Sequence, residues 1–165
     1  MNPYLQRMLG LVGDRSPVES MQESLQRIEA LAPRLNPELS YAEGKWTARE
    51  ILCHLADCEL GMGFRIRQIL SEDNHTVQPF EQDDWARLYS DVSMTQALHA
   101  FKGLRRWHLA LIAGLSEEQL ERTYYHPGRG EWESLRTLVG FLAGHDLNHL
   151  AQLEAIAGLS EAAQP

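Results

Sequence analysis

The chain has 165 residues, of which 44% are hydrophobic and 23% charged, so we expect one globular domain over residues 1–165. The formal net charge of −8 argues against nucleic acid or an anionic membrane surface as a partner, because both require a basic face. The first residues lack the features of a secretory signal, no apolar run is long enough to span a membrane, and two cysteines cannot build a disulfide framework, so we expect a cytoplasmic protein.

Capping motifs divide the chain into four long predicted helices. The segments "SPVE", "TARE" and "SMTQ" each place Ser or Thr at a helix start with Glu or Gln three residues later. With the apolar periodicity that follows them, they help to predict helices over about 16–35, 47–72, 93–113 and 133–157. A short helix is expected before the first of these, and the last is expected to begin near Glu133 or Ser134.

The segment 73–92 is a long connection that contains Pro79 and several acidic residues, and no part of the chain has a convincing strand pattern. A connection of this length does not suit a simple up-down-up-down bundle, and it can also cover one end of the bundle. The predicted fold class is therefore all-α, a four-helix bundle with a long crossover connection.

Two histidines lie on the inward face of the last predicted helix. Its seam residues are spaced alternately by four and three positions: Leu138, Leu142, His145, His149, Gln152 and Ile156. His145 and His149 are therefore neighbours on one helix face and can reach one ion. Buried imidazoles need polar partners, which either a cation or hydrogen-bonding groups of the core can provide. The spacing by itself leaves both interpretations open.

Two glycines, Gly140 and Gly144, lie one turn apart on the same helix and lower its helix propensity. They can admit a neighbouring helix at close range, or they can be tolerated without such a role.

His54 is the candidate for a third ligand. It lies at the border of the apolar face of the second helix, about 60° from the centre of that face, and could point between the second and last helices. Three protein ligands with a fourth position open are typical of a catalytic metal site. The last helix reads "HDLNH" and lacks the Glu of the HExxH motif of zinc proteases.

The segments "GKWTAREILCHLADCE", "RIRQIL", "HPGRGEW" and "HDLNHLAQ" resemble the DinB/YfiT-like superfamily of metal-dependent enzymes, over about residues 16–157. The resemblance implies a four-helix bundle, often a homodimer, with a divalent metal ion, commonly nickel, zinc or iron. On this chain the three histidine ligands that it implies are His54, His145 and His149. Some relatives carry a further histidine where this chain has Phe141, so its site is less polar than theirs.

The resemblance implies an enzyme that acts on small molecules. Relatives include S-transferases that use low-molecular-weight thiols such as bacillithiol or mycothiol, and a mycothiol-dependent isomerase. We therefore expect a metal-dependent transferase or hydrolase with a small-molecule substrate, and a low-molecular-weight thiol is a candidate partner. Alternatives are a non-catalytic bundle that binds a metal or small molecule, and a purely structural bundle. The sequence shows no separate general base or nucleophile, so catalytic residues stay unassigned.

Four further residues are candidates for a supporting role at this site: Gln152, Cys58, Asp57 and His126. Gln152 could hydrogen-bond a metal ligand, Cys58 could approach the ion, and Asp57 could orient a histidine or pair with Arg65. The alternative interpretations are that Gln152 is a core amide bonded to the backbone, that Cys58 is a small buried hydrophobic residue, and that Asp57 forms a surface ion pair. His126 could reach the mouth of the site. The acidic segment around Trp85 could form a lid over it or pack locally.

Overall fold

The computed structural model describes residues 2–162 and shows a bundle of four long helices. These are α2 (Pro17–Leu31), α3 (Ala48–Ser71), α5 (Met94–Ala113) and α7 (Leu135–Ala162). Thr47 and Ser93 form the predicted capping boxes, and the Ser16 side chain accepts a hydrogen bond from the Glu19 N–H. The predicted all-α four-helix bundle is confirmed. The first helix ends earlier than predicted, because Pro33 lies in the 3₁₀ turn η1 (Ala32–Arg34) that follows it.

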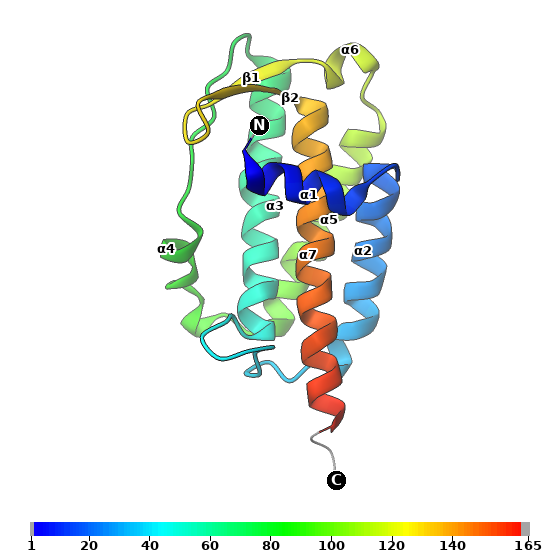
Figure 1. Ribbon diagram of the computed structural model, residues 1–165, viewed down its shortest axis with the longest axis vertical. Helices are drawn as coiled ribbons and strands as arrows, with labels where there is room; N and C mark the ends of the chain where they lie inside the picture. Colours follow the sequence, from blue (N-terminus) through cyan, green and yellow to red (C-terminus); the bar gives the residue numbers. More distant parts are fainter. Residues whose placement is uncertain (1, 163–165) are drawn as a thin grey trace.

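The crossover connection decides the topology of the bundle. After α3 the chain returns along the outside of the bundle through α4 (Gln82–Ala86) and the turn η2 (Tyr89–Asp91), so that α3 and α5 run in the same direction (Figure 1). α2 and α7 run the opposite way and pack against each other, and α2 also packs against α5. α3 packs against α5 and α7, which places the consecutive helices α2 and α3 diagonally across the bundle.

A β-hairpin precedes α7, and this corrects the expectation that the chain has no strand. β1 (Thr123–His126) pairs antiparallel with β2 (Glu131–Ser134), after the short helix α6 (Glu117–Leu120). Two strands of four residues are too short for a clear alternating pattern, which is why the sequence did not reveal them. Tyr124 packs the hairpin into the apolar core of the bundle, and its hydroxyl donates a hydrogen bond to Glu133, its partner on β2.

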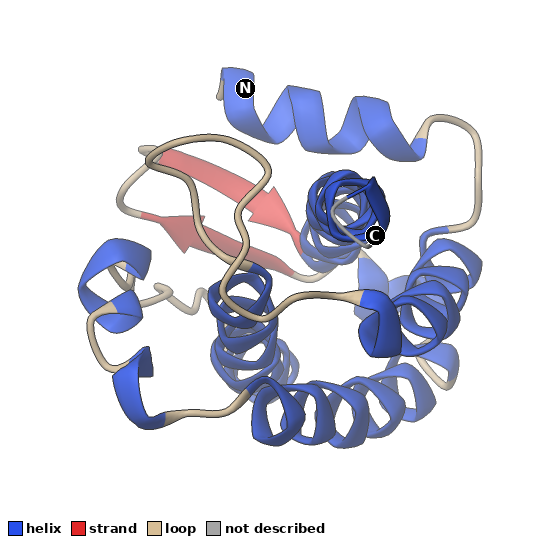
Figure 2. Ribbon diagram, turned by 90° about the horizontal axis from the view of Figure 1, so that it is seen from below, coloured by secondary structure: helices blue, strands red, loops and turns tan. Residues whose placement is uncertain are grey.

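The N-terminal helix α1 (Pro3–Val12) lies across α7 (Figures 1 and 2). The contact depends on the two glycines of α7. A Cβ atom at Gly144 would lie 1.9 Å from the carbonyl oxygen of Met8, and one at Gly140 would lie 2.9 Å from Leu9. The glycines therefore admit a neighbouring helix at close range, as one of the two sequence interpretations held.

The core consists of two apolar clusters with a polar layer between them. On α7, residues 135–143 belong to one cluster and residues 150–157 to the other. On α3 the corresponding stretches are 62–69 and 48–56. Glu59, His145, Asp146 and His149 are buried polar side chains that lie in this gap, and the buried His54 lies beside it, near the end of the 48–56 stretch. Arg65, the other buried polar side chain of α3, lies within the 62–69 stretch. The sequence thus interrupts its own apolar core at one level of the bundle.

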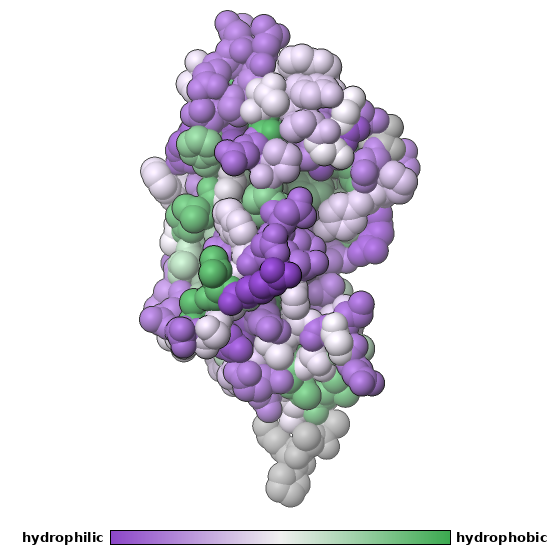
Figure 3. Space-filling view, turned by 90° about the vertical axis from the view of Figure 1, so that its left-hand side faces the viewer, coloured by the Kyte–Doolittle hydropathy of each residue, from purple (hydrophilic) through white to green (hydrophobic). Residues whose placement is uncertain are grey.

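The surface that carries α4 is largely hydrophilic, with apolar side chains in separate groups (Figure 3). Large exposed hydrophobic residues of the bundle include Leu60 and Phe64 on α3 and Trp107 on α5. None of the helices within residues 2–162 is long and apolar enough to cross a membrane.

Candidate metal centre

The three histidines singled out from the sequence come together in the polar layer. The Nε2 atom of His145 lies 3.0 Å from Nε2 of His54 and 3.2 Å from Nε2 of His149. His54 comes from α3 and the other two from α7, and all three are buried. The prediction that His54 reaches toward the last helix agrees with this arrangement.

Burial keeps these imidazoles neutral. It lowers the pKa of His54 to about 3 and that of His149 to about 4, and it lowers the pKa of His145 well below its ordinary value. His149 has a second fixed contact, since its Nδ1 lies 2.9 Å from Oε1 of Gln152. An amide oxygen can only accept, so Nδ1 carries the proton and the lone pair of His149 is on Nε2. The supporting role expected for Gln152 fits this contact.

The donor set fits a divalent metal ion. Metal–imidazole bonds of about 2.0–2.1 Å place two ligand nitrogens about 2.9–3.4 Å apart, which spans the two observed separations. Without a cation, the Nε2–H of a single ring could serve only one of the two short contacts well. The three buried imidazoles are neutral, which is the state that a metal ligand requires.

Cys58 borders the three histidines. Its Sγ lies 3.5 Å from Nε2 of His54, and the ligand atoms of His54, Cys58 and His145 all lie within 4.8 Å of one another. Burial raises the pKa of the Cys58 thiol, so the group is protonated at neutral pH unless an ion displaces its proton. The site therefore offers three nitrogen ligands with a thiol beside them.

Two aromatic residues pack against the imidazoles: Phe141, which the sequence analysis placed at the site, and Trp46, which it did not. The ring centroid of Trp46 lies 4.7 Å from that of His54 and 6.3 Å from that of His149, and Phe141 lies 5.8 Å from His145. Trp46 stands just before the Thr47 cap of α3, in the quoted segment "GKWTARE". Its place beside a helix start was the only signal for it.

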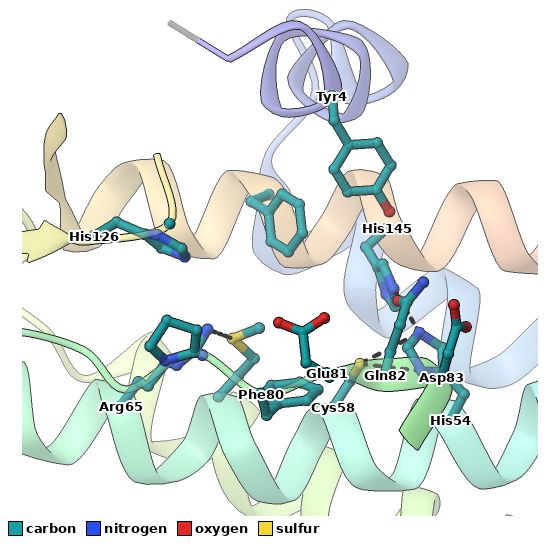
Figure 4. A pocket seen from close by; sticks show the side chains of 14 residues that line it. Tyr4, His54, Cys58, Arg65, Phe80, Glu81, Gln82, Asp83, His126 and His145 are labelled. Atoms are coloured by element: carbon teal, nitrogen blue, oxygen red, sulfur yellow. Dashed lines mark hydrogen bonds between the residues drawn. The ribbon is translucent and has the colours of Figure 1, made fainter. Parts of the chain in front are cut away.

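A cavity of about 540 Å³ opens beside His54 and His145 (Figure 4). α3 contributes Cys58, Met62 and Arg65 to its wall, and the crossover contributes residues 79–83. Tyr4 of α1, Phe141 of α7 and His126 of the hairpin complete it. His126, expected at the mouth of the site, lines the same cavity at the end away from the histidines, and the crossover, expected over one end of the bundle, lines the cavity wall.

Asp57 and Trp85, two further residues considered from the sequence, make contacts outside the histidine cluster. Asp57 contacts neither a histidine nor Arg65; it accepts a hydrogen bond of 2.8 Å from the hydroxyl of Tyr89. The reason is the crossover, which places η2 against the base of α3. Trp85 stacks on Phe80 with ring centroids 4.6 Å apart, which is the local packing that the sequence analysis set beside a lid.

A buried ion network lies behind the histidines and was not anticipated. The Arg105 guanidinium of α5 is 1% exposed and donates to both Glu59 and Asp146. Glu59 also contacts Nδ1 of His108 at 2.9 Å. Since Asp146 follows His145 and Glu59 follows Cys58, the network ties α3, α5 and α7 together at the level of the site. An arginine on an amphipathic helix carries no sequence signal of this kind.

Comparison with known proteins places these features in a family. The family model of the DinB superfamily matches residues 19–153. Two proteins of Oceanobacillus iheyensis, both named "putative metal-dependent hydrolase", are similar in sequence. One is 32% identical over 126 residues, which are 72% of this chain and 69% of the relative. The other is 30% identical over 154 residues, which are 87% and 88% of the two chains.

The solved structure of YfiT from Bacillus subtilis, described as "a probable metal-dependent hydrolase with an unusual four-helix bundle topology", matches the fold. Its TM-score is 0.79 at 23% identity, over 88% of this chain and 85% of that one, and at this identity the match supports the fold alone. The matched family model and the sequence relatives decide the family: the chain belongs to the DinB superfamily.

Proposed function

We propose that this protein is a metal-dependent hydrolase in which His54, His145 and His149 hold one divalent ion. The observation that carries the proposal is that Nε2 of His145 lies 3.0 Å from Nε2 of His54 and 3.2 Å from Nε2 of His149. The names of the sequence relatives support hydrolysis as the reaction class. Three imidazoles accept nickel, zinc or iron, so the native ion depends on supply and on geometry.

A divalent ion held here supplies Lewis-acid activation of water and of a polarised substrate bond. The side chains of the protein prepare the site for it. Gln152 holds the proton of His149 on Nδ1, so that Nε2 is free to bind. Trp46 and Phe141 pack against the imidazole rings and limit their rotation. The cavity next to His54 is large enough for a small molecule and gives it access to the site.

Thiol transfer is the second reaction considered. It follows from the wider resemblance to the family, whereas the relatives found here carry names of hydrolases only. A non-catalytic metal-binding bundle would have the same three ligands but no turnover. We therefore rank hydrolysis first, and the assay below separates the three.

The test is metal content by mass spectrometry on protein purified without chelator, compared with His145→Ala. His99→Ala is the matched control, because His99 is exposed and lies on α5 away from the site. We expect about one equivalent of nickel, zinc or iron in the unchanged protein and in the control, and loss of the ion in His145→Ala. Failure of the unchanged protein to bind any of these ions refutes the proposal.

The same preparations are then assayed against small esters, amides and phosphoesters, with and without low-molecular-weight thiols. Hydrolysis that needs the ion and disappears in His145→Ala supports the proposal. Turnover that appears only with a thiol supports the transferase instead. Metal binding without any turnover supports the binding protein.

A further inference from the structure

The end of the cavity opposite the histidines has an unusual charge. Arg65 and His126 lie there, away from His54 and His145 (Figure 4). Arg65 is on the same helix as His54 and follows it by 11 residues, which is three turns or about 16 Å along the helix axis. His126 is the last residue of β1 and enters the cavity from the hairpin.

The Arg65 guanidinium is 7% exposed and has no carboxylate partner. Within residues 2–162, its Nη2 donates to the carbonyl oxygen of Gln78 at 2.6 Å, its Nη1 contacts Sδ of Met62 at 3.4 Å, and its Cζ lies 5.2 Å from the centre of the Phe80 ring. None of these partners carries a charge. Burying a cation without an anion is costly, so this end of the cavity holds an uncompensated positive charge.

Two other arginines of the chain, in contrast to Arg65, have carboxylate partners. Arg105, equally buried, is held by two carboxylates, and Arg129 is paired with Glu133 at 2.5 Å. Glu133 also accepts from Tyr124, so its oxygens are taken. The carboxylates of the crossover segment that line the same cavity are exposed and form no ion pair with Arg65. Of these three arginines, Arg65 alone has no carboxylate partner.

His126 adds a second polar group with unused capacity. It is 9% exposed, and its Nδ1 is buried without a hydrogen-bond partner. A Cβ at Gly128 would lie 3.3 Å from the ring, so the hairpin turn packs closely against it. Burial lowers the pKa of His126, and Arg129 and Arg65 lower it further against an opposing effect of Glu133, so the neutral ring has one N–H to donate.

We propose that Arg65 and His126 form an oxyanion-binding subsite, which holds a carboxylate or phosphate group of the substrate at the far end of the cavity. The uncompensated charge of Arg65 and the unused hydrogen-bonding capacity of His126 are both matched by such a group. A statement about the substrate follows, and it rests on the proposed function. The substrate is a small anion whose reacting bond lies beside the histidines and whose charged group lies about three helical turns away, at Arg65.

The experiment measures binding of butyrate, inorganic phosphate and the neutral isostere butyramide by calorimetry, to both metal-free and zinc-loaded protein. Arg65→Met removes the charge and keeps an unbranched apolar side chain. Arg67→Met is the matched control: Arg67 lies on the same helix, but it donates to the Gly63 carbonyl and lies over Trp107, and it does not line the cavity. Both variants change the net charge equally.

We expect one or both anions to bind the unchanged protein, in either metal state, and butyramide to bind at least tenfold more weakly. Arg65→Met is expected to weaken anion binding at least tenfold, while Arg67→Met leaves it unchanged. Butyrate alone binding identifies a carboxylate site, and phosphate alone a phosphate site. If neither anion binds, or if Arg65→Met binds them as well as the unchanged protein, the proposal is overturned.

Metal uptake of the same samples separates this result from the proposed function. Arg65→Met is expected to take up zinc normally, because Arg65 lies three turns from His54. If the unchanged protein takes up no metal, the proposed function is refuted. Anion binding measured on the metal-free protein still tests whether Arg65 and His126 form an anion-binding subsite. Should Arg65→Met not fold, Arg65→Gln carries the same comparison, since it keeps a donor for Gln78 without the charge.

Discussion

Replacement of Gly144 by alanine tests whether α1 lies as close to α7 as the structure places it. The added Cβ would lie 1.9 Å from the Met8 carbonyl oxygen, 2.5 Å from its carbonyl carbon and 3.0 Å from its Cα. These are backbone atoms, so no side-chain rotation relieves the overlap. α1 would have to move outward by about 1.5 Å to restore an ordinary contact of about 3.4 Å.

The cost follows from what α1 buries. Leu5, Met8 and Val12 are buried against the bundle and contribute about 1.5–3 kcal/mol each, or about 5–9 kcal/mol in total. A gap of about 1.5 Å forfeits about half of this, or about 3–4 kcal/mol. The higher helix propensity of alanine returns up to about 1 kcal/mol. We therefore expect Gly144→Ala to lower the free energy of unfolding by about 2–3 kcal/mol.

Urea denaturation of Gly144→Ala and of Gly158→Ala provides the measurement. Gly158 lies on the same helix with open space around it, so the same substitution is expected to stabilise the protein by up to about 1 kcal/mol. Opposite signs for the two variants support the close approach of α1. A Gly144→Ala protein as stable as the unchanged one would refute it. Because Tyr4 of α1 lines the cavity, displacement of α1 should also change ligand binding there.

Three further predictions concern the polar layer. Arg105→Met leaves Glu59 and Asp146 buried without their cation, so it should lower the free energy of unfolding by about 3–5 kcal/mol in urea titrations; a loss below about 1 kcal/mol would contradict the network. Gln152→Leu removes the partner of His149 Nδ1 and should weaken metal binding about 10- to 100-fold in competition with a chromophoric chelator, and an unchanged affinity would speak against that role. In the metal-free protein the pKa values of His54 and His149, about 3 and about 4, lie below the unfolded value of about 6.5, so the unfolded chain binds more protons between these limits. Stability should therefore be constant above about pH 7 and fall by up to about 1.4 kcal/mol per pH unit for each histidine as pH drops through that window, and a His54→Gln/His149→Gln variant with the same slope would show the reasoning to be wrong.

The sequence alone was sufficient for the features that depend on neighbours three or four residues away. Helix starts at Ser16, Thr47 and Ser93 follow from side-chain caps that close within one turn. The pairing of His145 with His149 is equally local, since residues four apart always share a helix face. His54 was a candidate from its place at the border of the apolar face of its helix, and the resemblance to the family, whose motif contains it, implied the same ligand.

Only the tertiary structure decided which helices meet at the level of the site. His54 and His145 lie 91 positions apart in the chain with the crossover between them, and the path of the crossover makes α3 the neighbour of α7. The same path sends Asp57 to Tyr89. No local rule links residues at such separations, because their contact depends on the order and rotation of the helices around the bundle.

The ion pairs of the buried arginines also depend on the tertiary structure and not on the local sequence. Arg65 and Arg105 lie on amphipathic helices of similar composition, and nothing in the sequence distinguishes them. In the fold, Arg105 meets two carboxylates from α3 and α7, whereas Arg65 faces a cavity and meets none. A buried charge is defined by the groups packed around it. The sequence determined the helices and the histidine pair of this protein, and the packing of the helices decided where its uncompensated charge lies.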